Sequence, residues 1–139
     1  MSSRSVTMRM LVLGSVMMGM AWGADDDAAF FSSTVRPILV NNCIRCHGPD
    51  KQKAHLRLDY RDAILAGGKS GPAAVPGKPD DSLIVKAIGY ADDDLQMPPK
   101  EKLSDPDIKT LVDWITRGLP WNPPAAGAAA PAPDAPKSP

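Results

Sequence analysis

Residues 43–47 read Cys-Ile-Arg-Cys-His, and the rest of the chain is best interpreted from this stretch. Its two cysteines are the only ones among 139 residues, so a fold built on several disulfides is excluded. The C-x-x-C-H spacing is the attachment signature of c-type haem. Two thiols bond to the vinyl groups of one porphyrin edge, and the next histidine is held beneath the iron. The motif therefore predicts one covalent haem c on Cys43 and Cys46, with His47 as the proximal iron ligand.

Two other chemistries use cysteines at this spacing. A thioredoxin-like redox pair follows a strand, whereas the segment before Cys43 is helix-like. A structural zinc site needs four ligands. The sulfur and nitrogen donors that the sequence offers are Cys43, Cys46, His47 and His55. Because Cys46 and His47 are adjacent, they suit a tetrahedral cage poorly, and haem is the preferred interpretation.

Met97 is predicted to be the second axial ligand. Haem electron carriers commonly place a methionine thioether opposite the histidine, and Met97 is the only one of seven methionines outside the first twenty residues. It lies in a polar loop before Pro98 and Pro99, where an apolar core residue is not needed. His55 is the rival ligand, and an open or water-ligated iron is the third alternative. We expect His47 and Met97 to be the two iron ligands.

Both ends of the chain are predicted to lie outside the haem domain. Residues 1–23 combine basic residues, an apolar run of 12 residues and small residues at a cleavage site, which is typical of a secretory signal peptide. The run is short for a bilayer span, so the mature protein is not expected to cross a membrane, although an uncleaved anchor is the alternative. Residues 123–139 are mostly proline and alanine, which predicts a disordered tail. The haem domain is then residues 24–122, in a periplasmic or equivalent exported compartment.

Helical periodicity dominates the first half of this domain. Residues 30–42 form an apolar stripe at helical spacing, with Pro37 either in the first turn or at a kink. Residues 59–66 predict a short helix that Asp59 caps and Gly67 ends. No segment indicates a strand. The first half is therefore expected to be helical, with the haem motif directly after the first helix.

Two further helices are expected in the second half. Asp80 or Asp81 caps one that carries apolar residues over positions 83–88. Ser104 caps the last one, whose apolar stripe is followed by Gly118. The chain thus predicts a small all-α fold of several short helices with long loops around one haem, with its first and last helices packed together.

Lysines flank the haem motif and Met97; they are Lys51, Lys53, Lys100 and Lys102. They are either a collar that steers docking of an acidic redox partner or ordinary solvated side chains. Arg57 is a candidate donor to the haem propionates, as is the indole of Trp114 or Trp121. The run Asp92–Asp94 lacks EF-hand spacing and is interpreted as a solvated loop rather than a calcium site.

Composition excludes other classes of function. The formal net charge is zero and the pI is about 6.7, which argues against a nucleic-acid-coating protein. The sequence contains no catalytic triad, phosphate-binding loop or other substrate-site pattern, so an electron carrier is expected rather than an enzyme. A haem-dependent peroxidase would need a distal acid or histidine, for which only His55 is available.

Several separated blocks recur in the order known from one family. They are Val35-Arg36-Pro37-Ile38-Leu39, the haem motif with Gly48-Pro49, Leu56-Arg57-Leu58-Asp59, Gly67-Gly68-x-Ser70-Gly71-Pro72, Val75-Pro76-Gly77-Lys78-Pro79-x-x-Ser82, Met97-Pro98-Pro99 and Leu111-x-x-Trp114-Ile115-x-x-Gly118-x-Pro120-Trp121. Over about residues 30–122 the chain resembles the planctomycete-type cytochrome c domain. The resemblance implies a class I cytochrome c-like fold, haem attachment through Cys43 and Cys46, and ligation by His47 and Met97.

The sequence as a whole predicts an exported monohaem c-type cytochrome that carries single electrons between redox partner proteins. Family members often fuse this domain to large downstream domains, so a chain ending in the proline- and alanine-rich segment is expected to be a stand-alone carrier. The alternative is a haem-based sensor or ligand-binding module with an open or weakly held sixth position. A non-haem exported metal-binding protein is a more distant alternative.

Overall fold

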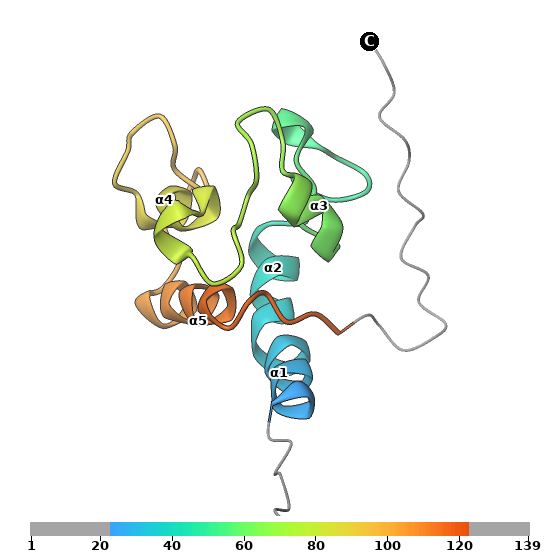
Figure 1. The fold of residues 1–139 in the computed structure, drawn as a ribbon. Coiled ribbons are helices and arrows are strands. Elements are labelled where there is room, and N and C mark those ends of the chain that lie inside the picture. The colour runs from blue at the N-terminus through green and yellow to red at the C-terminus, as the bar shows by residue number, and fades with distance from the viewer. Residues whose placement is uncertain (1–22, 123–139) are drawn as a thin grey trace, which may run out of the picture.

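Short helical segments build the part of the chain that the computed structural model describes, residues 23–122 (Figure 1). In chain order they are α1 (Ala24–Phe30), the π-helical η1 (Phe31–Val35), α2 (Arg36–Asn42), the 3₁₀ turn η2 (Lys53–His55), α3 (Arg61–Ala66), the 3₁₀ turn η3 (Pro79–Asp81), α4 (Leu83–Gly89) and α5 (Asp105–Thr116). No strand occurs in these residues, and the predicted all-α fold is confirmed. The predicted signal peptide, apart from Gly23, and the predicted tail lie outside the described residues.

The N-terminal helix is longer than predicted, because α1, η1 and α2 follow one another without a break from Ala24. Asp25, Asp26 and Asp27 occupy the first turn, where the helix dipole favours carboxylates. Pro37 lies in the first turn of α2 and does not end the helix. A proline ring clashes with the carbonyl four residues earlier in a regular α-helix, and the wider π-helical η1 immediately before it accommodates this ring.

The start of α3 differs from the prediction. The helix begins at Arg61, and Tyr60 before it is extended. The Asp59 carboxylate, predicted to cap this helix, instead accepts two hydrogen bonds from Arg57 at 2.9 and 2.6 Å. The predicted end is confirmed, because Gly67 follows α3 at φ +74°, a conformation that favours glycine.

The start of α4 also differs from the prediction. Asp80 and Asp81 belong to η3, and α4 begins after Ser82. Ser82 is fully buried, and its hydroxyl accepts a hydrogen bond from the Val75 N–H at 2.9 Å and donates one to the Lys78 carbonyl at 2.8 Å. This serine therefore closes the loop that precedes α4, and neither aspartate caps the helix.

α5 carries the aromatic core of the domain. Its predicted cap is confirmed, because the Ser104 hydroxyl accepts a hydrogen bond from the Asp107 N–H at 3.3 Å. Trp114 is fully buried, and its indole N–H donates to the Pro120 carbonyl at 2.8 Å. The Trp114 ring centre lies 6.0 Å from that of Phe31. The first and last helices therefore pack together, as predicted.

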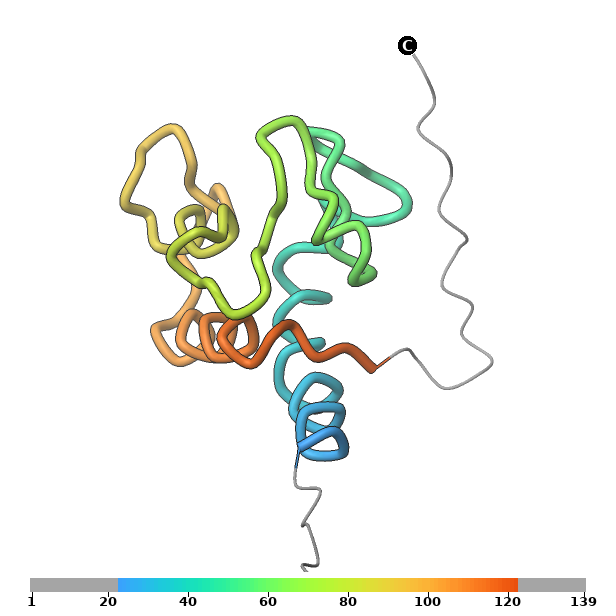
Figure 2. The backbone as a smooth tube through the Cα atoms, viewed as in Figure 1, coloured from blue at the N-terminus to red at the C-terminus, as the bar shows by residue number. Residues whose placement is uncertain are grey.

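Two lobes stand on this helical base. Figures 1 and 2 show α3 on one side and α4 on the other, with the loop of residues 67–78 running between them to α5. Ala73 joins this loop to both lobes, since its N–H donates to the Ile64 carbonyl at 3.0 Å and its carbonyl accepts from the Ile84 N–H at 2.9 Å. Gly77 donates to the Ile115 carbonyl at 2.8 Å, which anchors the loop on α5. None of the helices in residues 23–122 is long and apolar enough to cross a membrane.

Candidate functional site

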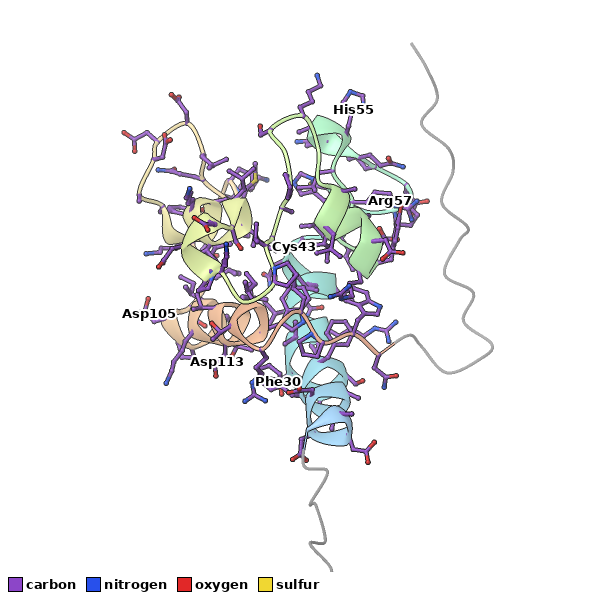
Figure 3. All side chains as sticks on the ribbon, viewed as in Figure 1. Phe30, Cys43, His55, Arg57, Asp105 and Asp113 are labelled. Atoms are coloured by element: carbon purple, nitrogen blue, oxygen red, sulfur yellow. The ribbon has the colours of Figure 1, made fainter. Side chains whose placement is uncertain are left out.

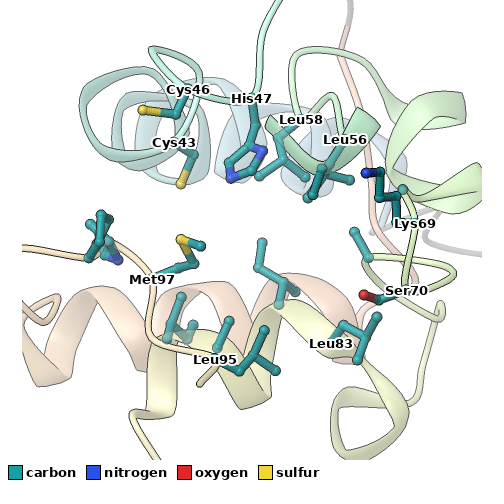
Figure 4. Close-up of a pocket in the computed structure, with 18 of the residues that line it drawn as sticks. Cys43, Cys46, His47, Leu56, Leu58, Lys69, Ser70, Leu83, Leu95 and Met97 are labelled. Atoms are coloured by element: carbon teal, nitrogen blue, oxygen red, sulfur yellow. The ribbon is translucent and has the colours of Figure 1, made fainter. Parts of the chain in front are cut away.

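A pocket opens between the two lobes (Figure 4). About 900 Å³ of space between its walls is unfilled, and this volume includes space that is open to solvent. Its lining is mainly apolar, from Ala54, Leu56, Leu58, Gly68, Gly71, Ala73, Leu83, Ile84, Ala87, Ile88, Leu95, Met97, Pro98 and Pro99. The remaining lining residues are Asn42, Cys43, Cys46, His47, Lys69 and Ser70. An apolar ligand with a few polar groups therefore suits this pocket.

Cys43 and Cys46 lie at the end of α2 and line one end of the pocket (Figure 4). A turn follows the helix, in which the N–H groups of Cys46 and His47 both donate to the Cys43 carbonyl, at 3.1 and 3.0 Å. The two cysteines are not joined to each other. Burial raises the pKa of the Cys43 thiol to about 11, so this sulfur is protonated at neutral pH.

His47 is 7% exposed, and its ring points into the pocket (Figure 4). Its Nδ1 lies 3.1 Å from the backbone carbonyl oxygen of Lys53. A carbonyl only accepts, so Nδ1 carries the proton, and the other ring nitrogen, Nε2, is left with a free lone pair. The Lys53 backbone is held in turn, because its N–H donates to the Cys46 carbonyl at 3.0 Å. The chain thus presents His47 in the tautomer that a metal ligand needs.

Met97 lies on the opposite wall, and Figure 4 shows its sulfur directed towards the wall that carries His47. The Met97 N–H donates to the Ala87 carbonyl of α4 at 3.1 Å, and the Tyr90 hydroxyl donates to the carbonyl of Pro98. These two bonds fasten the loop to α4. The Met97 side chain is 37% exposed, so it borders the opening of the pocket.

The other predicted site residues lie outside the pocket lining. Arg57 is 6% exposed and pairs with Asp59, and its guanidinium carbon lies 4.7 Å from the centre of the Tyr60 ring. Figure 3 shows Arg57 beside α3. His55 is exposed, and the pocket is lined instead by its neighbours in the chain. Trp114 directs its N–H to a backbone carbonyl in the core. The structure therefore gathers Cys43, Cys46, His47 and Met97, and it places Arg57 elsewhere.

Sequence reasoning missed three polar residues of the pocket, Asn42, Lys69 and Ser70. The last two follow a Gly-Gly pair in a loop that carries no periodic signal. The signal that could have found them is the pair itself, because adjacent glycines indicate close backbone approach. A side chain on Gly68 would place its Cβ 2.4 Å from the Ala54 carbonyl oxygen. The loop therefore packs directly against the segment that follows the haem motif.

Residues 43–101 match the family model described as Planctomycete cytochrome C. This match supports a planctomycete-type cytochrome c domain in that part of the chain. The matched residues include the whole pocket lining except Asn42, whereas α1, η1, α2 and α5 lie outside them. No curated protein and no solved structure matches the chain.

The family of this cytochrome c domain implies a haem group with iron, and the donor set of the pocket fits that group. One wall offers two thiols and an imidazole with a free Nε2, and the other offers a thioether. Haem iron is held by such nitrogen and sulfur ligands. Within residues 23–122, no three His, Cys, Asp or Glu side chains are grouped to hold a bare metal ion.

Proposed function

We propose that this protein is an exported monohaem c-type cytochrome that carries single electrons, with haem bound between His47 and Met97. The observation that carries the proposal is the meeting of Cys43, Cys46, His47 and Met97 around one apolar pocket. The first three come from the turn that follows α2, and Met97 comes from a loop fifty residues after His47. The match to the cytochrome c family supports the same function.

Each of these residues has a separate task in the proposal. When bound, the haem iron supplies the one-electron redox change. Cys43 and Cys46 would hold the macrocycle through thioether bonds, which would keep the cofactor from dissociating. His47 would bind the iron through Nε2, and its hydrogen bond to Lys53 keeps the imidazole ring from rotating. Met97 would supply a thioether ligand from the other wall, and such a ligand favours the reduced state and raises the potential.

The apolar walls have a task as well. Leucines and isoleucines from both lobes exclude water from the cofactor. A dry environment disfavours the extra positive charge of the oxidised centre and lowers the solvent rearrangement that accompanies electron transfer. The opening beside Met97 leaves one side of the pocket accessible to a redox partner.

Docking of that partner is proposed to involve the lysines of the predicted collar. Lys51, Lys53, Lys100 and Lys102 are all exposed. Exposed positive charges steer association with an acidic protein, and salt screens this effect. The rate of electron transfer to an acidic partner should fall as ionic strength rises. A flat salt dependence, unchanged by lysine-to-glutamate substitutions, would contradict this part of the proposal.

A spectroscopic experiment tests the haem and its ligands. We expect the protein purified from an exporting host to give the pyridine haemochrome spectrum of haem c, and Cys43→Ala with Cys46→Ala to abolish covalent attachment. The ferric wild type should show the long-wavelength thioether-to-iron band. Met97→Ala should lose it, while Gln96→Ala, which changes the neighbouring side chain, should keep it.

Other outcomes separate the alternatives. The absence of haem would contradict the proposed function. Persistence of the band in Met97→Ala would move the ligand role to another residue. Rapid binding of carbon monoxide or cyanide by the wild type would favour the sensor or ligand-binding module with an open sixth position.

A further inference from the structure

Lys69 is the one cationic side chain that lines the pocket in residues 23–122. Ser70 beside it is exposed and lines the pocket too. We propose that Lys69, assisted by the Ser70 hydroxyl, binds a propionate group of the haem. The proposal rests on the proposed function, because it requires haem in this pocket, and it assigns a residue that the sequence did not suggest.

The placement of Lys69 matches the asymmetry of the cofactor. Figure 4 shows Lys69 and Ser70 at the end of the pocket remote from Cys43 and Cys46. The porphyrin carries its two propionates on the side away from its two vinyl groups. When the vinyl edge is attached to the cysteines, the propionates are therefore directed towards Lys69. An ammonium and a hydroxyl are both donors to a carboxylate, and the ammonium also balances its charge.

The other polar side chains of the lining are already engaged. The Asn42 amide donates to the Ile38 carbonyl at 2.9 Å, and Nδ1 of His47 is bonded to Lys53. Among the described residues, the side chains of Lys69 and Ser70 make no hydrogen bond or ion pair with the protein. The hydrogen-bond donors of Lys69 and Ser70 are therefore available at the end of the pocket where the two haem propionates would lie.

The backbone holds Lys69 at this position. Its N–H donates to the Ala54 carbonyl at 3.0 Å, and Gly68 and Gly71 close a small turn around it through bonds of 3.2 and 3.1 Å. A Cβ on Gly67 would lie 1.8 Å from the Gly71 carbonyl oxygen. Gly67 and Gly68 therefore allow close packing of the turn, and the backbone of Lys69 is held in a fixed position.

Arg57 is the residue that the sequence suggested for the propionates, and its surroundings differ. Its Nε and one terminal nitrogen donate to the two carboxylate oxygens of Asp59, and it does not line the pocket. A guanidinium that already satisfies one carboxylate in a bidentate pair has less to offer a second. Lys69 is the better placed cation, because it lines the pocket and is not paired with any carboxylate of residues 23–122.

A zero-length cross-link tests the contact directly. In the holoprotein a carbodiimide activates the propionate, the Lys69 amine attacks it, and an amide forms while the elements of water leave in the urea by-product. Digestion should yield the haem peptide that contains Cys43 and Cys46 joined to the peptide that contains Lys69. Tandem fragmentation should place the amide on the haem rather than on Asp50. Lys69→Arg, which keeps the charge but cannot form this amide, should abolish the product, whereas Lys109→Arg on α5 should not.

The reduction equilibrium provides a second readout. Removal of a positive charge beside the cofactor favours the oxidised state, so Lys69→Gln should lower the equilibrium constant for reduction by about two- to tenfold at low salt. Lys69→Arg should restore the wild-type value, and Lys69→Glu should lower it further. Lys109→Gln should have no effect, because no residue of α5 lines the pocket.

The outcomes separate this proposal from the proposed function. A protein without covalent haem would contradict both. Covalent haem with no amide at Lys69, with an amide formed through another lysine, or with equal effects of Lys69→Gln and Lys109→Gln would overturn the role of Lys69 and leave the electron-carrier proposal standing.

Discussion

Nδ1 of His47 lies 3.1 Å from the backbone carbonyl oxygen of Lys53. The bond joins the haem motif to η2, and a second bond of 2.7 Å, from the Leu58 N–H to the His47 carbonyl, holds the same segment. The His47 imidazole is therefore oriented by backbone groups, and these groups are present whichever side chain residue 53 carries. The ligand geometry should tolerate a change of the Lys53 side chain but not a disturbance of its backbone.

Lys53→Pro tests this orientation. Proline removes the N–H that donates to the carbonyl of the half-buried Cys46, so this carbonyl loses its partner. We expect the holoprotein to lose about 0.5–1.5 kcal/mol of unfolding free energy and its thioether-to-iron band to weaken. Lys53→Ala is the control, because it keeps both backbone groups, and it should leave the band unchanged. Equal effects of the two substitutions in guanidinium denaturation and absorption spectra would contradict the prediction.

Tyr90→Phe should loosen the Met97 loop. The substitution removes the hydroxyl that donates to the Pro98 carbonyl and keeps the ring. A neutral hydrogen bond contributes about 0.5–1.5 kcal/mol, so the ferric protein should bind cyanide or imidazole about two- to tenfold faster. Stopped-flow absorbance measures the rate. Tyr60→Phe is the matched control, because the Tyr60 ring packs on Arg57 in the other lobe. A wild-type rate in Tyr90→Phe would show that this bond does not restrain Met97.

Gly67→Ala and Gly77→Ala should differ in their effect on stability. Both glycines have positive φ, +74° and +75°, so alanine is strained at each position. Gly67 also has ψ −161°, a backbone conformation that is essentially restricted to glycine. Only at Gly67 would the new Cβ meet backbone, 1.8 Å from the Gly71 carbonyl oxygen, while nothing lies within 4 Å at Gly77.

We therefore expect Gly67→Ala to destabilise the holoprotein clearly more than Gly77→Ala, as measured by guanidinium unfolding. If Lys69 binds a propionate, Gly67→Ala should also shift the reduction equilibrium, because it displaces the turn that carries the lysine. Equal losses of stability would mean that the turn relaxes without cost.

Trp114→Phe should weaken the base on which both lobes stand. The indole is fully buried, and its N–H donates to the Pro120 carbonyl at 2.8 Å. Phenylalanine keeps an aromatic ring but leaves that carbonyl unpaired and a gap in the core, at a cost of about 1–3 kcal/mol. Trp121→Phe should cost less, since Trp121 is only partly buried. Denaturation midpoints measure the difference, and a larger loss from Trp121→Phe would be the contrary result.

Much of the fold could be predicted because it depends on neighbours in the chain. The apolar stripe of α5, its cap at Ser104 and the stop at Gly67 all follow from residues within a few positions of each other. The predicted helix starts were wrong where a competing interaction partner or a neighbouring segment determined where the helix begins. Asp59 was predicted as a cap, yet Arg57 binds it. Pro37 lies in the first turn of α2, one of the two alternatives, but the helical run begins at Ala24 and not at residue 30, because η1 continues it up to Pro37.

The sequence by itself determined the donor set that we propose for the haem, because the C-x-x-C-H spacing and the single methionine outside the first twenty residues are present whatever fold surrounds them. Only the tertiary structure decided which other polar groups lie near these donors in the pocket. It directed His47 Nδ1 to the Lys53 carbonyl and brought Lys69 to the pocket from a loop without periodicity, whereas the bond between Arg57 and Asp59 joins residues two positions apart. The physical reason is that motif spacing is carried by adjacent covalent bonds. The position of Lys69 depends instead on hydrogen bonds and close glycine contacts between segments that meet only after the chain has folded.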